Sequence, residues 1–403
     1  MLNFFNNGEC LLLTVHYSPS SVIIRAMDEK IYRIALDARF WRKDTAGIGR
    51  YTRELVHYLA KIDKTNQYTV ILTNQDVPEW DVHQDNFKTA VVPFTHYSLS
   101  EQSRFLLWLN KQNFDLVHFL NFNHPVLYHK RFVVTIHDLT LFKFPADNKK
   151  RSMLRKLAFY AVFKHAAKYS NKVIAISKNT LEDTAKYFNV RINKFKLIYE
   201  GGPKIDESIK YNRESVTKYI ESDCAYFLFV SQWRPHKGII TLVDAFNKFK
   251  AISKSNHKLV LLGNQKVATT QMLASINNSP YRSDIIIPGF APDELLPSLY
   301  HFSTAFIVPS EYEGFGLPVL EAYSYQTPAI VAENSSLPEV AGKNALYFPT
   351  NNSDKLAEQM VRIIEDPSLA KILKSSGDEQ LKLFSWQKCA QETYDTYIEV
   401  LKG

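Results

Sequence analysis

A strand, a glycine-rich turn and the start of a helix follow one another in Ala305-Phe-Ile-Val-Pro-Ser-Glu-Tyr-Glu-Gly-Phe-Gly-Leu-Pro-Val-Leu-Glu321. The first four residues are apolar and predict a buried strand. Pro318 fits the first helical position, where its missing N–H group breaks no hydrogen bond. Gly314 and Gly316 let the backbone approach a ligand closely. The N–H groups of Gly316 and Leu317 would then face outward at a helix N-terminus, which predicts an anion site at the end of a strand.

Strand and helix patterns alternate on both sides of this stretch. Amphipathic segments such as Leu242–Phe249 and Pro292–Tyr300 predict helices between short apolar runs. The runs predict buried parallel strands over Tyr32–Asp37, Tyr68–Thr73, Leu116–Leu120, Phe132–Ile136, Val173–Ile176, Tyr226–Val230, Leu259–Leu262, Ile285–Ile287, Ala305–Val308 and Ala329–Val331. This alternation is typical of α/β proteins with doubly wound parallel sheets.

A charged segment without a strand pattern, residues 204–223, divides the alternation in two. We therefore expect two Rossmann-like α/β domains, one over residues 31–204 and one over residues 205–385. The tail, residues 386–403, has apolar residues at helical spacing. We expect it to form a helix that packs back on the N-terminal domain.

The first 30 residues lack the basic start, the long apolar core and the small-residue cleavage site of a signal peptide. Met27 stands shortly before the first clear strand pattern. We expect residues 1–30 to be an extension outside the fold, with Met27 as the native start. A genuine N-terminal arm is the alternative.

The composition is that of a globular protein, with 45% apolar and 22% charged residues among 403. The three cysteines, Cys10, Cys224 and Cys389, are far apart and form neither a metal-spaced cluster nor a disulfide framework, which favours a reducing cytoplasm. No apolar run approaches the ~20 residues that span a bilayer. The formal charge of +8 suits a nucleic acid, an anionic membrane or an anionic substrate equally.

The two glutamates Glu313 and Glu321, with Gly-Phe-Gly-Leu-Pro between them, resemble the motif of the retaining GT-B glycosyltransferases of family 4. That family contains many bacterial mannosyl- and glucosyltransferases, and the resemblance extends over nearly the whole chain. It implies that the two domains face each other across a cleft, with residues 31–204 as the acceptor-binding domain and residues 205–385 as the nucleotide-sugar-binding domain. It implies that Glu313 contacts the donor sugar and that Glu321 hydrogen-bonds the ribose of the nucleotide. The backbone of the motif would hold the diphosphate, through Gly314, Phe315, Gly316 and Leu317.

A basic loop, Val230-Ser-Gln-Trp-Arg-Pro-His-Lys-Gly238, follows the first predicted strand of the second half. It resembles the family's loop that holds the donor phosphates, and Lys237 takes the place of the family's lysine. Many members have an arginine directly after the strand, where this chain has Gln232. Arg234 is the candidate for supplying the missing charge.

Two elements of the first half match the family's order. Thr45-Ala-Gly-Ile-Gly-Arg-Tyr51 resembles its first β–α loop, in which Gly47 and Gly49 would let the backbone approach the diphosphate. Val134-Thr-Ile-His-Asp-Leu139 resembles its His-Asp element and implies that His137 lies in the cleft near the transferred sugar. A structural histidine at a strand end is the alternative for His137.

The segment Pro288-Gly-Phe290 resembles the loop that meets the nucleotide base through its backbone, at Gly289 and Phe290. The chain contains no Asp-x-Asp triplet of the kind that metal-dependent glycosyltransferases typically use. We therefore expect a metal-independent enzyme without a cofactor, in which the nucleotide sugar is a substrate.

The resemblance implies transfer of a hexose from GDP-mannose or a UDP-sugar, with retention of configuration, in cell-surface polysaccharide synthesis. The acceptor would be a glycan or a polyprenyl-linked glycan. Three alternatives stay open. An epimerase on the same fold would consume the donor without an acceptor, a phosphorylase would need free phosphate, and a non-catalytic subunit would bind the sugar nucleotide only.

Residues 141–172 combine nine basic side chains with one acidic side chain and with interleaved apolar ones. A basic amphipathic helix of this kind lies on anionic membranes, so we expect the protein in the cytoplasm and peripherally on the inner face of the plasma membrane, bound through residues 143–172. A solvated cationic face is the alternative. No nucleic-acid recognition motif accompanies the charge, so we expect no nucleic-acid partner. The basic residues are Lys143, Lys149, Lys150, Arg151, Arg155, Lys156, Lys164, Lys168 and Lys172.

Overall fold

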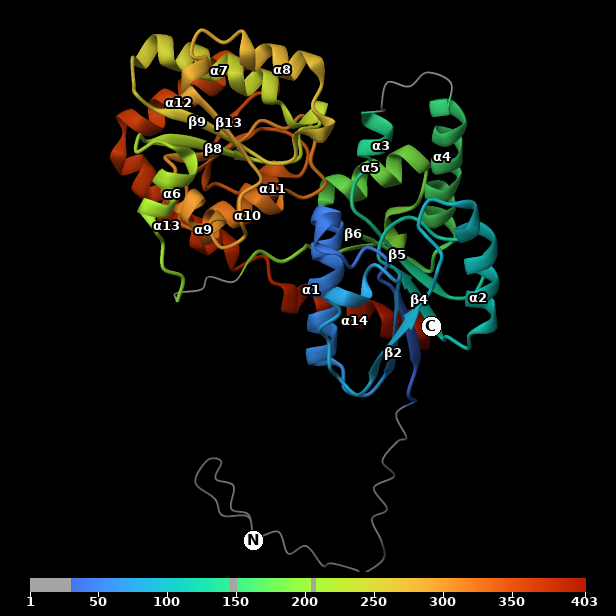
Figure 1. Ribbon diagram of the computed structural model, residues 1–403. Helices are drawn as coiled ribbons and strands as arrows, with labels where there is room; N and C mark the ends of the chain where they lie inside the picture. The colour runs from blue at the N-terminus through green and yellow to red at the C-terminus, as the bar shows by residue number, and fades with distance from the viewer. Residues whose placement is uncertain (1–29, 145–150, 204–207) are drawn as a thin grey trace, which may run out of the picture. The chain divides into compact units, whose positions relative to one another are not determined.

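The computed structural model describes residues 30–144, 151–203 and 208–403, and Tyr32–Gly403 form one compact unit (Figure 1). Residues 1–29, on which the predicted extension falls, lie outside the described part. The unit contains two parallel sheets with helices on their faces, which confirms the predicted α/β class. The predicted domain boundaries stay a prediction.

The first sheet has seven parallel strands in the order β3-β2-β1-β4-β5-β6-β7. They are β1 (Arg33–Asp37), β2 (Gln67–Leu72), β3 (Phe87–Val91), β4 (Leu116–Phe119), β5 (Phe132–Ile136), β6 (Lys172–Ala175) and β7 (Phe195–Leu197).

The second sheet has six parallel strands in the order β10-β9-β8-β11-β12-β13. They are β8 (Tyr226–Val230), β9 (Lys258–Leu262), β10 (Ile285–Gly289), β11 (Ala305–Val308), β12 (Ala329–Ala332) and β13 (Ala345–Phe348). In each sheet the chain begins in the middle, builds toward one edge and then returns to build the other half, which is the doubly wound pattern.

Helices cover both faces of each sheet. In the first sheet, α1 and α14 share a core with one face, and α2, α4 and α5 share a core with the other. In the second sheet, α7, α8 and α12 lie on one face and α9, α10 and α11 on the other (Figure 1). The helices are α1 (Ala46–Ile62), α2 (Leu106–Lys111), α3 (Thr140–Lys143), α4 (Arg151–Tyr169), α5 (Lys178–Phe188), α6 (Arg213–Ile220), α7 (Ile239–Ser253), α8 (Thr270–Asn277), α9 (Leu296–His301), α10 (Leu317–Ser324), α11 (Leu337–Ala341), α12 (Ser353–Glu365), α13 (Pro367–Leu381) and α14 (Trp386–Lys402).

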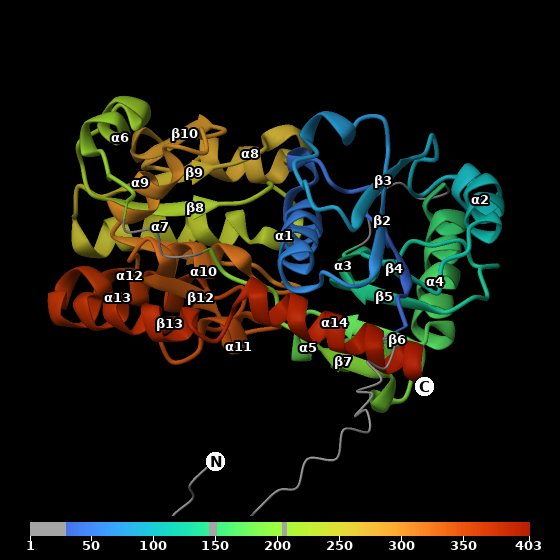
Figure 2. The same ribbon diagram turned by 90° about the horizontal axis from the view of Figure 1, so that it is seen from below.

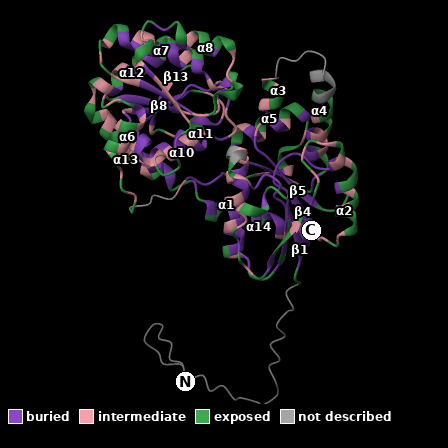
Figure 3. Cartoon of the chain, in the orientation of Figure 1, coloured by how far each residue is buried: buried purple, intermediate pink, exposed green. Residues whose placement is uncertain are grey.

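The strands are apolar because both faces of each sheet are covered. In β1, Ile34 and Leu36 enter one core and Ala35 enters the other, as the alternation of side chains along a strand requires. Figure 3 shows the same burial along the inner strands of both sheets and exposed residues on the outer sides of the helices. The continuous apolar runs in the sequence are therefore strands of this doubly covered kind.

Three strands were not predicted, namely β3, β7 and β13. The predicted helix over Pro292–Tyr300 starts later, because Pro292 begins a turn whose carbonyl oxygen accepts hydrogen bonds from the N–H groups of Leu295 and Leu296. The charged segment predicted as a linker contains α6, which contacts β10 and α9. Charged residues of the segment, Arg213, Glu214 and Lys218 among them, belong to this amphipathic helix, in which Val216 and Ile220 are buried.

The last helix, α14, packs on α1 and β6 of the first sheet (Figure 2). Its Tyr397 hydroxyl lies 2.6 Å from Nδ1 of His118 in β4, and Nε2 of His118 lies 2.9 Å from the Thr135 hydroxyl in β5. At its start, Trp386 lies against Gly201, where an added Cβ would stand 2.3 Å from the Trp386 nitrogen. A buried polar chain and a close backbone contact thus fix α14 to the first sheet.

The contact at Gly201 predicts a stability effect. We expect Gly201→Ala to lower the free energy of unfolding by about 1–3 kcal/mol, because the new methyl group forces Trp386 and the start of α14 to shift. Gly47→Ala is the matched control: no atom lies within 4 Å of its Cβ position in the first turn of α1, so its stability should equal or exceed that of the wild type. Urea unfolding measures both variants, and equal stabilities of the two would contradict the packing argument.

The buried His118 predicts a pH dependence of stability. Burial, and secondly the charge of the nearby His137, lowers the pKa of His118 from 6.5 to about 3. Below pH 6.5 the unfolded chain therefore binds a proton at His118 that the folded chain does not bind. The contribution of the neutral His118 to the free energy of unfolding is complete above pH 6.5 and is lost as the pH falls toward 3. The free energy of unfolding should fall by up to ~1.4 kcal/mol per pH unit on this account.

The test is urea unfolding of wild type, His118→Gln and His129→Gln at pH 7, 6 and 5. Glutamine at position 118 keeps a donor and an acceptor but does not titrate, so its pH slope should be shallower than that of the wild type. His129 is exposed, and its variant serves as the matched control. A slope in His118→Gln as steep as in the wild type would exclude His118 as its source.

Candidate active site

The site forms where two loops leave the same edge of the second sheet. Strand β8 pairs with β11, so the loop after each strand begins beside the other. The N–H group of Glu311 donates to the His236 carbonyl, 2.7 Å away. Gly238 has a φ of +72°, and a Cβ there would lie 2.0 Å from the Pro309 carbonyl oxygen. Only glycine fits this contact, and it holds the two loops together.

The two loops bring Lys237 and Glu313 together. The Lys237 ammonium lies 2.7 and 2.8 Å from the two carboxylate oxygens of Glu313, and the side chains are 18% and 15% exposed. The Ser310 hydroxyl donates to the same carboxylate at 2.6 Å, and the Glu313 N–H group donates to the Ser335 hydroxyl at 3.0 Å. Two residues predicted for the donor site are therefore neighbours and form a partly buried ion pair.

The second motif glutamate, Glu321, lies in α10 and holds a different cation. Its carboxylate accepts a hydrogen bond from the Tyr300 hydroxyl at 3.0 Å and pairs with the guanidinium of Arg50 in α1. The side chains of Arg50 and Glu321 are 28% and 16% exposed. Burial opposes the charge on Arg50, but the carboxylate of Glu321 outweighs it and raises the pKa of Arg50 above its ordinary value.

The motif meets the first sheet at Gly314. A Cβ on Gly314 would lie 2.3 Å from the His137 carbonyl oxygen and 2.9 Å from Cβ of Asp138. The Thr180 hydroxyl, at the start of α5, lies 3.1 Å from the His137 carbonyl oxygen and 3.2 Å from that of Gly314. The backbone of the predicted His-Asp element is thus in direct contact with the backbone of the predicted diphosphate loop.

The ring of His137 is held by protein groups on both sides. Its Nε2 donates to the Leu120 carbonyl at 2.9 Å, and its Nδ1 lies 3.4 Å from the buried carboxylate of Glu200. The edge of the ring meets Tyr51, with the ring centres 4.8 Å apart. The residue is 8% exposed. His137 is therefore fixed near the motif, and its predicted contact with the sugar stays a prediction.

The glycines predicted for a first β–α loop lie in a helix instead. Helix α1 begins at Ala46, so Gly47 and Gly49 occupy its first turn. Gly49 packs closely, because a Cβ there would lie 2.9 Å from the Phe40 carbonyl oxygen. The first four N–H groups of a helix have no partner within it. Any approach to a diphosphate at these glycines would thus use a helix N-terminus rather than a loop.

The other residues predicted to bind the donor differ in how far they are exposed to solvent. Arg234 is exposed, and its Nε donates to the Gln232 side chain at 3.1 Å. Phe290 is 78% exposed, and its carbonyl accepts from the Tyr219 hydroxyl at 2.8 Å. Phe315 is 3% exposed, and its carbonyl accepts a hydrogen bond from the Ser336 hydroxyl at 2.7 Å. Gly289 and Gly316 have φ values of +89° and +109°, which favour glycine.

Helix α10 starts at Leu317, one residue before the predicted start at Pro318. Gly316 precedes it and contributes no side-chain cap. The N-terminus of α10 is therefore free of a side-chain capping partner, as an anion site requires.

Sequence reasoning missed four residues of the site. Ser310 was quoted as part of the motif but had no assigned role, and Arg50 directly follows Gly49. Tyr300 ends the segment predicted as a helix over Pro292–Tyr300, and Glu200 lies just before the charged segment predicted as a linker. A search for polar side chains next to each motif could have found Ser310 and Arg50, whereas Tyr300 and Glu200 are apparent only from the fold.

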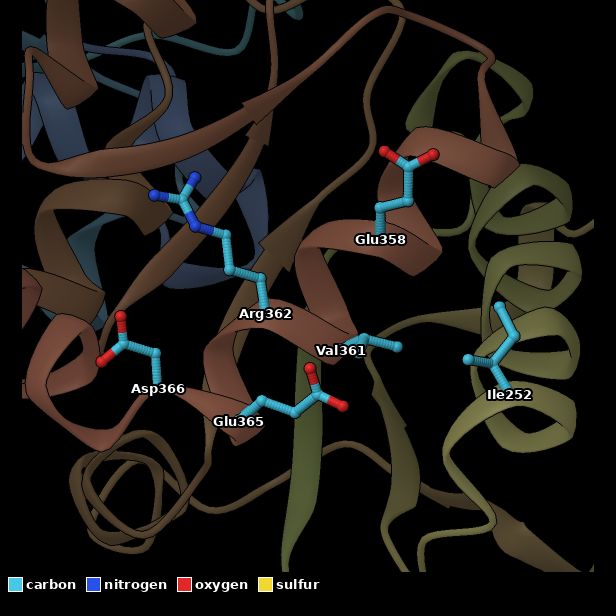
Figure 4. A pocket seen from close by; sticks show the side chains of 6 residues that line it. All are labelled: Ile252, Glu358, Val361, Arg362, Glu365 and Asp366. Atoms are coloured by element: carbon cyan, nitrogen blue, oxygen red, sulfur yellow. The ribbon is translucent and has the colours of Figure 1, made fainter.

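A hollow of about 340 Å³ lies elsewhere on the second sheet's helices (Figure 4). Its lining comes from the C-terminal ends of α7 and α12 and from the residue after α12. Helix α7 connects the parallel strands β8 and β9 and therefore runs opposite to them, so its C-terminal end lies at the edge where the strands begin. The hollow is thus at the other edge from the motif. It is lined by Ile252, Glu358, Val361, Arg362, Glu365 and Asp366.

The described residues contain neither a membrane-spanning helix nor a metal-binding cluster. Within residues 30–144, 151–203 and 208–403, no helix combines the length and the apolar character that crossing a membrane requires. In the same ranges, no three His, Cys, Asp or Glu side chains gather in a way that could hold a metal ion. The expectation of metal-independent transfer stays a prediction.

Two family models match the chain. The model for glycosyl transferases group 1 matches residues 212–380, and the model for glycosyltransferase family 4 matches residues 45–201. Together they cover more than three quarters of the chain.

Individual proteins agree with the models. O-antigen chain mannosyltransferase B of Escherichia coli is 27% identical over 383 residues, which are 87% of this chain and 95% of that enzyme. A glycosyltransferase of Rickettsia africae has the same fold, with a TM-score of 0.72 at 20% identity over 93% of this chain and 99% of the other. Anabaena Alr3699/HepE, solved with UDP and glucose, gives a TM-score of 0.71 at 16% identity over 91% of this chain and 100% of the other. The chain therefore belongs to the glycosyltransferases of group 1 and family 4, which have the GT-B fold.

Proposed function

We propose that this chain is a retaining hexosyltransferase, which moves a mannosyl or related hexosyl group from a nucleoside-diphosphate sugar to a glycan or lipid-linked glycan. The observation that carries the proposal is the Lys237–Glu313 pair, held at the carboxyl edge of the second sheet where strand order reverses. Ligands of doubly wound proteins bind at this position. The 27% identity to an O-antigen mannosyltransferase supports mannose as the sugar and surface polysaccharide as the product.

The two charges of the pair suit the two ends of such a donor. Lys237 would turn to the diphosphate, together with the uncapped N-terminus of α10. Glu313 would turn to the hydroxyl groups of the sugar, because a carboxylate accepts hydrogen bonds from them. Ser310 and Ser335 already fix the position of Glu313, so little reorganisation is needed when the donor arrives.

In the proposed reaction, the bond between C1 of the sugar and the diphosphate oxygen breaks, and C1 forms a bond to the acceptor oxygen. The proton of the acceptor hydroxyl passes to an oxygen of the leaving diphosphate on the same face of the sugar. Negative charge grows on the diphosphate during this step. Lys237 stabilises it in a partly buried setting, where preorganised charge acts more strongly than in water.

Removing Lys237 should therefore slow the reaction. We expect Lys237→Ala to reduce turnover by about 10²–10³-fold, because the leaving group loses a positioned cation. Turnover is measured as GDP release from GDP-mannose and UDP release from UDP-glucose, with mannose oligosaccharides as acceptors.

Lys248→Ala is the matched control, because Lys248 forms an ion pair of 2.6 Å with Asp354 away from the motif loops. Its turnover should equal that of the wild type. Wild-type turnover in Lys237→Ala, or an equal loss in both variants, would remove Lys237 from the proposed site.

We further propose that α4 and its surroundings contact an anionic membrane. The support is uneven along residues 143–172. Lys143 and Lys172 pair with Asp183 and Glu399, at 2.6 and 3.0 Å, and are less available. The exposed cations of the described part include Lys156 and Lys168. Lys149 and Lys150 lie outside the described residues, as do the side chains of Arg151 and Arg155.

Flotation with vesicles tests this surface. Vesicles with anionic lipid should recover more protein than neutral vesicles, and Lys156→Glu with Lys168→Glu should reduce the recovery, since each basic residue near the surface adds ~1 kcal/mol. The matched control is Lys254→Glu with Lys266→Glu, two exposed lysines of the second sheet's surroundings. Equal recovery on both kinds of vesicle would contradict the membrane contact.

A further inference from the structure

Each of the two motif glutamates holds one cation, and the two cations come from different sheets. Glu313 holds Lys237, which follows β8 of the second sheet. Glu321 holds Arg50, which lies in α1 beside the first sheet. Both pairs are partly buried, and both carboxylates accept a further hydroxyl hydrogen bond, from Ser310 and from Tyr300. The arrangement therefore repeats one pattern at both ends of the motif.

A leaving diphosphate calls for more positive charge than Lys237 alone supplies. At the second position after β8, where an arginine would add to the lysine, this chain has the neutral Gln232. Arg234 is exposed and hydrogen-bonds to Gln232. Arg50, in contrast, already lies against a carboxylate of the motif. It is the better-placed source of a second charge.

We propose that Arg50 is the second phosphate-binding cation of the site, and that Glu321 holds it until the donor binds. The inference rests on the proposed function and on the family resemblance, which implies that the carboxylate of Glu321 hydrogen-bonds the ribose. The ribose carries the first phosphate on its 5′ carbon, so a guanidinium that leaves this carboxylate is within reach of that phosphate. The exchange replaces one anion beside Arg50 with another.

The chemistry of the side chain suits this exchange. A guanidinium presents several N–H donors in a planar fork that matches carboxylate and phosphate oxygens alike, which a lysine ammonium does not. The pair is 28% and 16% exposed, so solvent screens it less than a surface pair. The start of α1 is fixed by the close contact at Gly49, so the helix presents Arg50 from a defined position.

The competing explanation is that Arg50 only links α1 to α10 through Glu321. The two explanations differ in what they predict for ligands with and without phosphate. If Arg50 binds phosphate, its loss weakens the binding of nucleoside diphosphates. The binding of nucleosides is then kept, because Glu321 is free to contact the ribose. If Arg50 is only a link, its loss changes both classes of ligand alike or changes neither.

Calorimetric titration of the full chain with GDP, UDP, guanosine and uridine distinguishes phosphate binding by Arg50 from a purely structural link. For the diphosphate that the wild type binds, we expect Arg50→Met to weaken binding by about 10- to 100-fold, the range for a charged hydrogen bond. The matching nucleoside should bind Arg50→Met as well as the wild type or better. Arg50→Lys, which keeps the charge but loses the fork, should fall between wild type and Arg50→Met for the diphosphate.

Lys61→Met is the matched control, because Lys61 is an exposed cation in the last turn of the same helix, and it should bind the diphosphate as the wild type does. Unchanged diphosphate binding in Arg50→Met would overturn the inference, as would an equal loss for the nucleoside. If Arg234→Met lost diphosphate binding and Arg50→Met did not, Arg234 would be the second phosphate-binding cation. If the wild type bound neither diphosphate, the proposed function itself would fail, which distinguishes that outcome from all the others.

Discussion

The site depends on the pairing of β11 with β8, the first strand of its sheet, rather than with β10, the strand before it in the chain. Ala305 and Phe306 lie opposite Phe227 and Leu228 in this pairing. Because the strands are parallel, the loops after β8 and β11 leave at the same edge, and the residues at their ends meet although 76 positions separate Lys237 from Glu313. Gly238 and Gly314 then permit the close backbone contacts on which the loops rest. Other strand orders would separate the lysine from the glutamate.

Much of this fold could be predicted from apolar runs alone. Strands buried on both faces, such as β4 and β5, are continuous apolar segments in the sequence. The strands that escaped prediction, β3, β7 and β13, all lie at a sheet edge. Edge strands are covered on fewer sides, and β3 (FKTAV) and β7 (FKL) carry polar residues within very short segments. Such segments lack the pattern that distinguishes a buried strand from a loop.

Site residues could be predicted from the sequence where they belong to one short motif. They could not be predicted where two residues far apart in the sequence meet only in the fold. Glu313, Glu321 and Lys237 belong to compact motifs whose glycines and prolines limit the backbone to one arrangement. Arg50 pairs with a residue 271 positions away, and Glu200 meets His137 only because β7 and β5 belong to the same sheet. These pairings depend on which strand neighbours which, and no short segment contains that information. The helical position of Gly47 and Gly49 escaped for a different reason, since two glycines near a helix start indicate a loop equally well.

The two ion pairs of the motif leave their four side chains with little net charge. In a cell, inorganic phosphate and many metabolite anions compete for any exposed lysine or arginine. A small anion that displaced Glu313 and Glu321 from their cations would leave two partly buried carboxylates with fewer donors, which opposes its binding. A sugar nucleotide supplies phosphate oxygens for the cations and hydroxyl groups for the carboxylates in one molecule. Under the proposed function, the two pairs would therefore disfavour simple anions and favour a ligand that presents both kinds of group at the right separation.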